Sequence, residues 1–120
     1  MARPIRISIV DDDRSVREGL SRLLSSVGFA VNTFASAEEY LRSGQPGSAD
    51  CLILDIRMSG MNGIELHRQL AASQSDVPVI FITAHDEETE RAQALGGTVL
   101  IKPFSEEALL NAINQALIAS

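Results

Sequence analysis

The feature that most constrains the fold is a regular alternation of short apolar runs with helical patterns. Five runs resemble strands, because they are short, rich in β-branched residues and bounded by turn residues; they are 5–10, 29–34, 51–55, 78–83 and 98–101. A helical pattern follows each of them. This alternation is typical of βαβ units, which build a parallel sheet with helices on both faces. We therefore expect an α/β domain with a doubly wound, five-stranded parallel sheet.

Local signals indicate where the helices begin and end. The first helical pattern ends near Gly28, a residue that suits the position just past a helix. Ser36 followed by Glu39 predicts a capping box at the start of the second helix. The fourth pattern, from about 86 to 95, is short and mostly polar, and Ser105 can cap the fifth helix.

Length, charge and cysteine content narrow the class of protein. A chain of 120 residues suits a single domain. Its net charge of −6 repels the nucleic-acid backbone, so we expect no direct binding of DNA or RNA by this domain. The single cysteine, Cys51, cannot form an internal disulfide and is expected to be a small buried hydrophobe. The sequence has no recognisable signal peptide and no apolar stretch near 20 residues, so we expect a cytoplasmic location and no membrane contact.

Chemically active side chains stand at the carboxyl ends of four predicted strands: Asp11, Asp12 and Asp13 after the first, Asp55 on the third, Thr83 on the fourth and Lys102 after the fifth. Each has an ordinary structural explanation alone, such as a helix N-cap for Asp13. In doubly wound folds, however, the carboxyl ends of the strands form the binding site. We therefore expect these groups to gather at one edge of the sheet.

The gathered aspartates would repel one another. At about 5 Å and an effective dielectric constant near 20, each pair of like charges costs roughly 3 kcal/mol. Raised pKa values, a nearby cation or a bound metal must relieve that repulsion. Lys102 supplies one positive charge. Carboxylate and carbonyl oxygens suit Mg²⁺, which keeps several waters and accepts phosphate oxygens as further ligands.

This set of groups suits phosphoryl transfer. A carboxylate can act as a nucleophile and form an acyl phosphate. Lys102 and the Thr83 hydroxyl would hold the other phosphoryl oxygens, which is the positioning and charge stabilisation that the reaction needs. Ala84, after the threonine, leaves room for the incoming group. His67 lies on the predicted third helix and is expected to be solvated.

The sequence resembles the receiver domain of bacterial two-component response regulators over essentially its whole length. The ordered motifs that carry the resemblance are IVDDD (9–13), LILDIRMSGMNG (52–63), FITA (81–84) and IKPF (101–104). The resemblance is greatest to receivers of regulators with a LuxR-type DNA-binding domain, a domain that these residues do not include. It implies a flavodoxin-like sheet with strand order 2-1-3-4-5, and a single receiver domain over 1–120.

The resemblance also implies a role for each matching residue. Asp55 looks like the phosphoacceptor, which takes the phosphoryl group from a phosphohistidine of a sensor kinase. Asp12 looks like a direct ligand of Mg²⁺ or Mn²⁺ together with Asp55, and Asp11 acts mainly through water. The backbone carbonyl of Arg57 would complete the protein ligands. Such a domain is not a conventional enzyme, although it catalyses its own phosphorylation and its slow autodephosphorylation.

Thr83 and Lys102 match the switch hydroxyl and the phosphate-binding lysine of the family, and the Lys102–Pro103 peptide bond resembles one that is commonly cis there. The implied partners are a sensor histidine kinase or phosphotransfer protein, an output domain or partner protein, and a second copy in a phosphorylation-dependent homodimer.

Three positions depart from the family pattern. Ser59 replaces the usual proline in the loop after the acceptor. The stretch between Thr83 and Lys102 is shorter than usual, so we expect the fourth helix to be short or displaced. Val99 stands where an aromatic residue is usual, so the usual coupling between threonine and aromatic cannot operate. Arg57 and His85 are expected to flank the entrance to the acyl phosphate and to tune its hydrolysis.

Three other classes of protein share parts of this pattern. An Asp-nucleophile phosphatase of the haloacid-dehalogenase type needs a second acid two residues after the nucleophile, where this chain has Arg57. A flavin-binding protein would not place three aspartates beside the cofactor phosphate. An atypical receiver that acts as a phosphorylation-independent interaction module is consistent with the short fourth helix.

Overall fold

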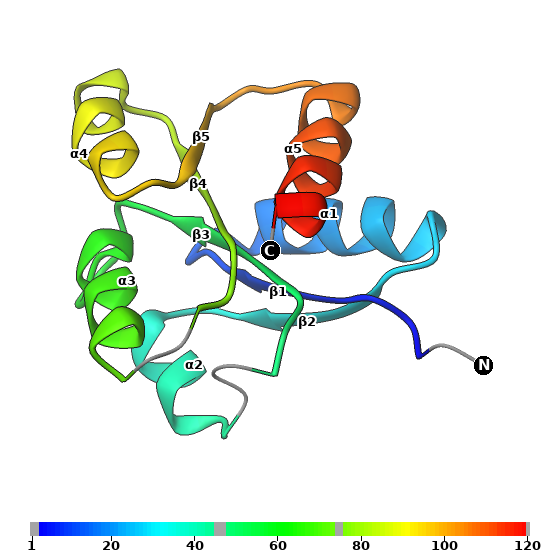
Figure 1. The fold of residues 1–120 in the computed structure, drawn as a ribbon, viewed down its shortest axis with the longest axis horizontal. Coiled ribbons are helices and arrows are strands. Elements are labelled where there is room, and N and C mark those ends of the chain that lie inside the picture. The colour runs from blue at the N-terminus through cyan, green and yellow to red at the C-terminus, as the bar shows by residue number, and fades with distance from the viewer. Residues whose placement is uncertain (1–2, 45–47, 74–75, 120) are drawn as a thin grey trace.

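The computed structural model describes residues 3–44, 48–73 and 76–119. In these ranges five strands form one parallel sheet in the order β2-β1-β3-β4-β5, which confirms the expected topology (Figure 1). The strands are β1 (Arg6–Val10), β2 (Ala30–Phe34), β3 (Cys51–Asp55), β4 (Val79–Thr83) and β5 (Thr98–Ile101). The helices are α1 (Arg14–Ser26), α2 (Ala37–Arg42), α3 (Gly63–Ala72), α4 (Thr89–Ala94) and α5 (Glu106–Ala119).

The helices cover both faces of the sheet, and each face has its own hydrophobic cluster. Buried residues of α1 and α5 pack on one face, and those of α2, α3 and α4 pack on the other (Figure 1). The central strand β3 is buried throughout and supplies both clusters in alternation: Cys51 and Ile53 face α1 and α5, while Leu52 and Leu54 face the other layer. This two-sided burial explains the uninterrupted apolar run before Asp55.

Cys51 lies in this core, as expected. It is fully buried, and burial raises the pKa of its thiol to about 12. The thiol is therefore a packing group, since it is neither accessible nor ionised near neutral pH.

Four N-caps fix the start of helices near the carboxyl edge. One is Ser105, as predicted, whose Oγ accepts a hydrogen bond from the Ala108 N–H at 3.0 Å at the start of α5. The Asp13 carboxylate accepts hydrogen bonds from the backbone N–H groups of Ser15 and Val16, as expected for a cap of α1. Ser36 caps α2 as predicted, but the Glu39 carboxylate accepts from the N–H of Ala35, so the reciprocal bond differs from that of a capping box. A complete capping box occurs instead at the start of α3, between Asn62 and Glu65.

The segment between β4 and β5 is short, as predicted. A 3₁₀ turn over Asp86–Glu88 leads into the six-residue helix α4. The Lys102–Pro103 peptide bond that follows β5 is cis, as the resemblance implies.

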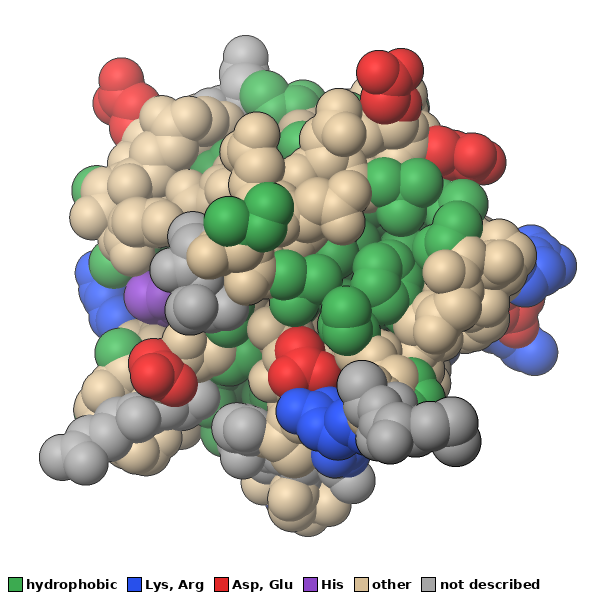
Figure 2. Space-filling model, turned by 45° about the vertical axis from the view of Figure 1, so that its right-hand side comes forward, with side chains coloured by type: hydrophobic (Ala, Val, Ile, Leu, Met, Phe, Trp, Pro, Cys, Tyr) green, Lys and Arg blue, Asp and Glu red, His purple; other side chains and the backbone are tan. Residues whose placement is uncertain are grey.

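Most large apolar side chains are inside the protein. Among the described residues, those that stay exposed are Ile5, Val27, Ile101 and Ile118. Figure 2 shows one face on which hydrophobic side chains gather near the middle and charged ones lie mainly towards the rim. None of the described helices is long and apolar enough to cross a membrane.

Candidate functional site

Three carboxylates meet at the carboxyl edge of the sheet, as the sequence predicted. Asp11 and Asp12 follow β1, and Asp55 is the last residue of the neighbouring strand β3. One oxygen from each lies within 4.8 Å of the others. Asp11 is fully buried and Asp55 is 5% exposed, whereas Asp12 faces solvent. The cluster therefore has two buried acids beneath an exposed one.

Lys102 supplies positive charge from the far side of the cluster. Its Nζ lies 3.0 Å from Asp11 Oδ2 and 3.8 Å from Asp55 Oδ1. The second oxygen of Asp11 accepts a hydrogen bond from the backbone N–H of Asp13 at 2.8 Å. Asp11 is thus satisfied at both oxygens, which explains how a fully buried carboxylate is tolerated.

The negative charges of Asp11 and Asp12 repel the ionised form of Asp55, as the sequence predicted. Burial, and after it the negative charge of Asp11, raise the pKa of the Asp55 carboxyl to about 7, although Lys102 acts in the opposite direction. Asp12 adds a smaller upward contribution to that pKa. One lysine therefore leaves the charge of three carboxylates only partly compensated.

The residues of the cluster fit a divalent metal ion. Their side chains offer hard oxygen ligands from two buried acids and one exposed acid, and the exposed one leaves a side open to water. Mg²⁺ binds through one or two carboxylates while it keeps several waters. A cation at this position would also relieve the repulsion that raises the pKa of Asp55.

Thr83 lies at the same edge, at the end of β4, and is fully buried. Its Oγ1 accepts a hydrogen bond from the His85 N–H at 3.0 Å and lies 3.2 Å from the His85 carbonyl oxygen, to which it donates. In this structure the hydroxyl thus stabilises the turn after β4.

The structure connects Arg57 and His85 to the segment before α4. The Arg57 guanidinium lies 2.8 Å from a Glu87 oxygen and 3.2 Å from a Glu88 oxygen. His85 Nδ1 lies 3.8 Å from the same Glu87 oxygen, and Glu88 also pairs with Arg91 at 3.4 Å. Arg57 and His85 therefore both approach Glu87, and Arg57 joins the loop after β3 to the 3₁₀ turn before α4.

Sequence reasoning missed two contacts that hold the loop after Asp55. The N–H of Ser59 donates to Asp12 Oδ2 at 3.3 Å, and the N–H of Met61 donates to Glu38 Oε2 at 3.0 Å. The Met61 N–H lowers the pKa of the Glu38 carboxyl. The partners are 47 and 23 residues apart, so no local pattern could reveal these contacts.

The expectation for His67 was wrong. The side chain is half-buried, and its ring centroid lies 5.5 Å from that of Phe81. Its Nδ1 is buried and has no hydrogen-bond partner among the described residues. Burial lowers the pKa of this imidazole, so His67 is a neutral packing residue of α3.

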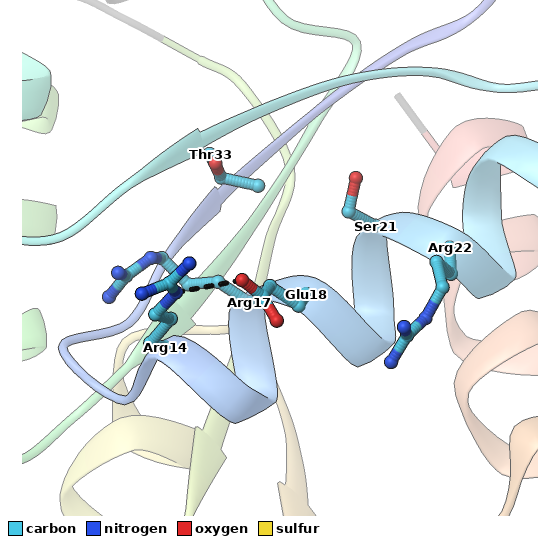
Figure 3. Close-up of a pocket in the computed structure, with 6 residues that line it drawn as sticks. All are labelled: Arg14, Arg17, Glu18, Ser21, Arg22 and Thr33. Atoms are coloured by element: carbon cyan, nitrogen blue, oxygen red, sulfur yellow. Dashed lines mark hydrogen bonds and ion pairs between the residues drawn. The ribbon is translucent and has the colours of Figure 1, made fainter.

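A groove of about 400 Å³ lies between α1 and the edge strand β2, outside the carboxylate cluster (Figure 3). Its lining residues are Arg14, Arg17, Glu18, Ser21, Arg22 and Thr33. Arg14 is paired with Glu18 at 2.8 Å. Arg17 Nη1 donates to the Asp11 carbonyl oxygen at 2.8 Å and so supports the loop that carries two of the acids.

Comparisons with known proteins identify the family of this chain. Residues 7–114 match the family model described as the response regulator receiver domain. The response regulator protein TodT of Pseudomonas putida is 42% identical over 92% of this chain and 50% of its own length. The response regulator StyR has a solved structure with a TM-score of 0.88 and 48% identity, covering 98% of this chain and 61% of that one.

A structure titled FixJ-N has a TM-score of 0.88 and 31% identity, covering 99% of this chain and 98% of that one. Nodulation protein W of Bradyrhizobium diazoefficiens is 40% identical over 89% of this chain and 48% of its own length. The chain therefore spans about half the length of the curated relatives that it matches. From the family model, these relatives and the shared fold, the chain belongs to the family of response regulator receiver domains.

Proposed function

We propose that Asp55 accepts a phosphoryl group and that this event switches the interactions of the domain. The observation that carries the proposal is the geometry around Asp55: a nearly buried carboxylate beside Asp11 and Asp12, with the Lys102 ammonium 3.8 Å away. Family membership supports the assignment of these groups to phosphoryl transfer.

In the proposed reaction an ionised Asp55 oxygen attacks the phosphorus of a phosphohistidine. The new O–P bond forms as the N–P bond breaks, and the imidazole takes up a proton from solvent. Lys102 stabilises negative charge on the phosphoryl oxygens, and Thr83 holds another of these oxygens after its hydroxyl leaves His85. A sensor histidine kinase or a phosphotransfer protein would be the donor.

Asp11, Asp12 and Asp55 would hold Mg²⁺ or Mn²⁺, with the Arg57 carbonyl as a further ligand by resemblance to the family. When bound, the ion would balance the negative charge of the three carboxylates and of the phosphoryl oxygens. Asp12 would bind it directly and Asp11 through water. A cytoplasmic location would follow, since a kinase that uses ATP would act there.

A small phosphodonor tests the proposal. Wild-type protein is incubated with Mg²⁺ and acetyl phosphate, and intact mass is then measured beside Asp55→Asn. We expect an adduct of one phosphoryl group in the wild type and none in Asp55→Asn. Asp76→Asn, an exposed acid outside the cluster, is the matched control and should still form the adduct. Equal adducts in wild type and Asp55→Asn would contradict the assignment of Asp55.

A second function is favoured by the segment between β4 and β5. Helix α4 has only six residues, and Val99 of β5 stands where the family usually has an aromatic residue. These features suit a receiver that binds its partner, an output domain or a second copy without needing phosphorylation. No adduct with acetyl phosphate or with a phosphorylated donor protein would favour this function over the switch.

A further inference from the structure

The loop between β3 and α3 is held by two carboxylates from other parts of the chain. Asp12, after β1, accepts the Ser59 N–H, and Glu38, in α2, accepts the Met61 N–H. Gly60 lies between the two donors, and a Cβ there would stand 2.7 Å from Glu38 Oε2. The loop backbone therefore passes close to both acids and is fixed on either side of Gly60.

Asp12 is the member of the carboxylate cluster whose position is least secure. Asp11 is buried and satisfied by Lys102 and the Asp13 N–H, and Asp55 is nearly buried at the end of β3. Asp12 is exposed, and the other two carboxylates of the cluster, Asp11 and Asp55, carry the same sign of charge when they are ionised. Without a restraint, rotation of its side chain towards solvent would lower the repulsion within the cluster.

We infer that the Ser59 backbone N–H is this restraint, and that it positions Asp12 to bind the divalent cation. The bond occupies only Oδ2, so the second oxygen of Asp12 remains available as a ligand. A backbone donor on a loop that Glu38 also holds restrains Asp12 without the entropy cost of ordering another side chain. This inference rests on the proposed metal-dependent function and concerns how its metal site is prepared.

Ser59 stands at a position where this chain departs from the family pattern. The proline usual at this position has no N–H and could not make the bond. Ser59 therefore adds a link between the β1–α1 and β3–α3 loops that a proline would remove, while the Ser59 hydroxyl itself has no part in the bond.

Two substitutions at this position separate the N–H from the side chain. Ser59→Ala keeps the N–H, whereas Ser59→Pro removes it. Mg²⁺ affinity is measured by calorimetric titration, and Mn²⁺ affinity by electron paramagnetic resonance. We expect Ser59→Ala to bind within about twofold of wild type, and Ser59→Pro to bind roughly three- to tenfold more weakly, as for the loss of one hydrogen bond. Equal affinities of Ser59→Pro and Ser59→Ala would overturn the inference.

A second measurement avoids proline altogether. In ¹⁵N-labelled protein with EDTA, Asp12→Ala should move the Ser59 amide proton upfield, because that proton loses its acceptor. The Met61 amide, bonded to Glu38, is the internal control and should keep its shift. An unmoved Ser59 amide would overturn the inference whatever the titrations show.

The outcomes also distinguish this inference from the proposed function. A wild-type protein that binds neither Mg²⁺ nor Mn²⁺ would contradict the metal site itself. Wild-type binding that Ser59→Pro leaves unchanged would contradict only the positioning role. Thermal unfolding in EDTA checks that Ser59→Pro remains folded.

Discussion

Asp55 is a buried carboxylate at the end of β3, and its proposed role as the phosphoacceptor would require it to be ionised. Burial and the charge of Asp11 raise the pKa of its carboxyl to about 7, from an ordinary value near 3.9. The folded state then holds a proton that the unfolded state releases. As pH rises between these two pKa values, the folded state becomes less stable relative to the unfolded state.

This shift predicts that Asp55→Asn stabilises the metal-free protein at high pH. In EDTA at pH 8 the substitution removes the cost of ionising Asp55, and we expect the melting temperature to rise by roughly 5 °C or more. At pH 4 the carboxyl is protonated in the folded state, so the difference should nearly vanish. Thermal unfolding followed by circular dichroism measures both. A difference that does not depend on pH would contradict the raised pKa.

Gly63 gives a second prediction at this scale. Its N–H donates to the Ile56 carbonyl at 2.8 Å, and a Cβ would stand 2.3 Å from the Asp55 carbonyl oxygen. Gly63→Ala must therefore move the backbone beside Asp55, at a cost of about 1–3 kcal/mol. Gly19→Ala is the control, because a Cβ there meets nothing within 4 Å and should stabilise α1 by roughly 0.5–1 kcal/mol. Denaturant unfolding compares them, and equal effects would contradict the steric explanation.

Among the elements, the β3–α3 loop and the 3₁₀ turn before α4 are joined by the Arg57 ion pairs with Glu87 and Glu88. These side chains are largely exposed apart from Glu88, so each pair contributes little to stability. Their importance is positional. They bring Arg57 to Glu87, which His85 also approaches, and the backbone N–H of His85 bonds to the Thr83 hydroxyl in the turn after β4.

We predict that Arg57→Ala and His85→Ala change the lifetime of the acyl phosphate more than the yield of phosphorylation. Loss of either side chain opens the approach of water, so we expect a lifetime at least about twofold shorter, a change of about 0.4 kcal/mol in the barrier. Arg68→Ala, an exposed arginine of α3, is the matched control. Lifetimes follow from intact mass after removal of the phosphodonor. Unchanged lifetimes in both variants would contradict the tuning role.

The element pattern also shows what the sequence could predict. The spacing of apolar residues and the helix-capping residues located the strands and helices. Burial of one or two faces of an element determines which of its positions are apolar, so the sequence shows the element directly. The carboxylate cluster followed from topology, since parallel strands bring Asp11 and Asp55 to one edge. The hydrogen bonds from the Ser59 N–H to Asp12 and from the Met61 N–H to Glu38 could not be predicted from the sequence. Nearly every residue carries a backbone donor, and the partner of each donor depends on the loop geometry. His67 was misassigned because packing against Phe81 is a tertiary contact without a local signature.

At the scale of the whole molecule, the acidic edge of the sheet is both the candidate site and a source of instability. The chain carries a net charge of −6, and three of its acids converge on one point with Lys102 as the nearby cation. A ligand that binds the folded state alone stabilises it in proportion to the logarithm of its concentration. A divalent cation should therefore stabilise the entire fold, since the acids that would bind it come from β1 and β3, two central strands.

We predict that 10 mM Mg²⁺ raises the melting temperature of the wild type by about 10 °C if the concentration is near 100 times the Kd. The shift should be larger at pH 8 than at pH 6, because the ion requires an ionised Asp55, whose pKa is raised to about 7 in the absence of metal. Asp12→Asn should lose most of the shift, and Asp76→Asn, an exposed acid outside the cluster, should keep it. NaCl at matched ionic strength controls for general screening of the negative charge. Equal shifts in Asp12→Asn and Asp76→Asn would show that Mg²⁺ acts on the net charge of the chain and would contradict a site at Asp11, Asp12 and Asp55.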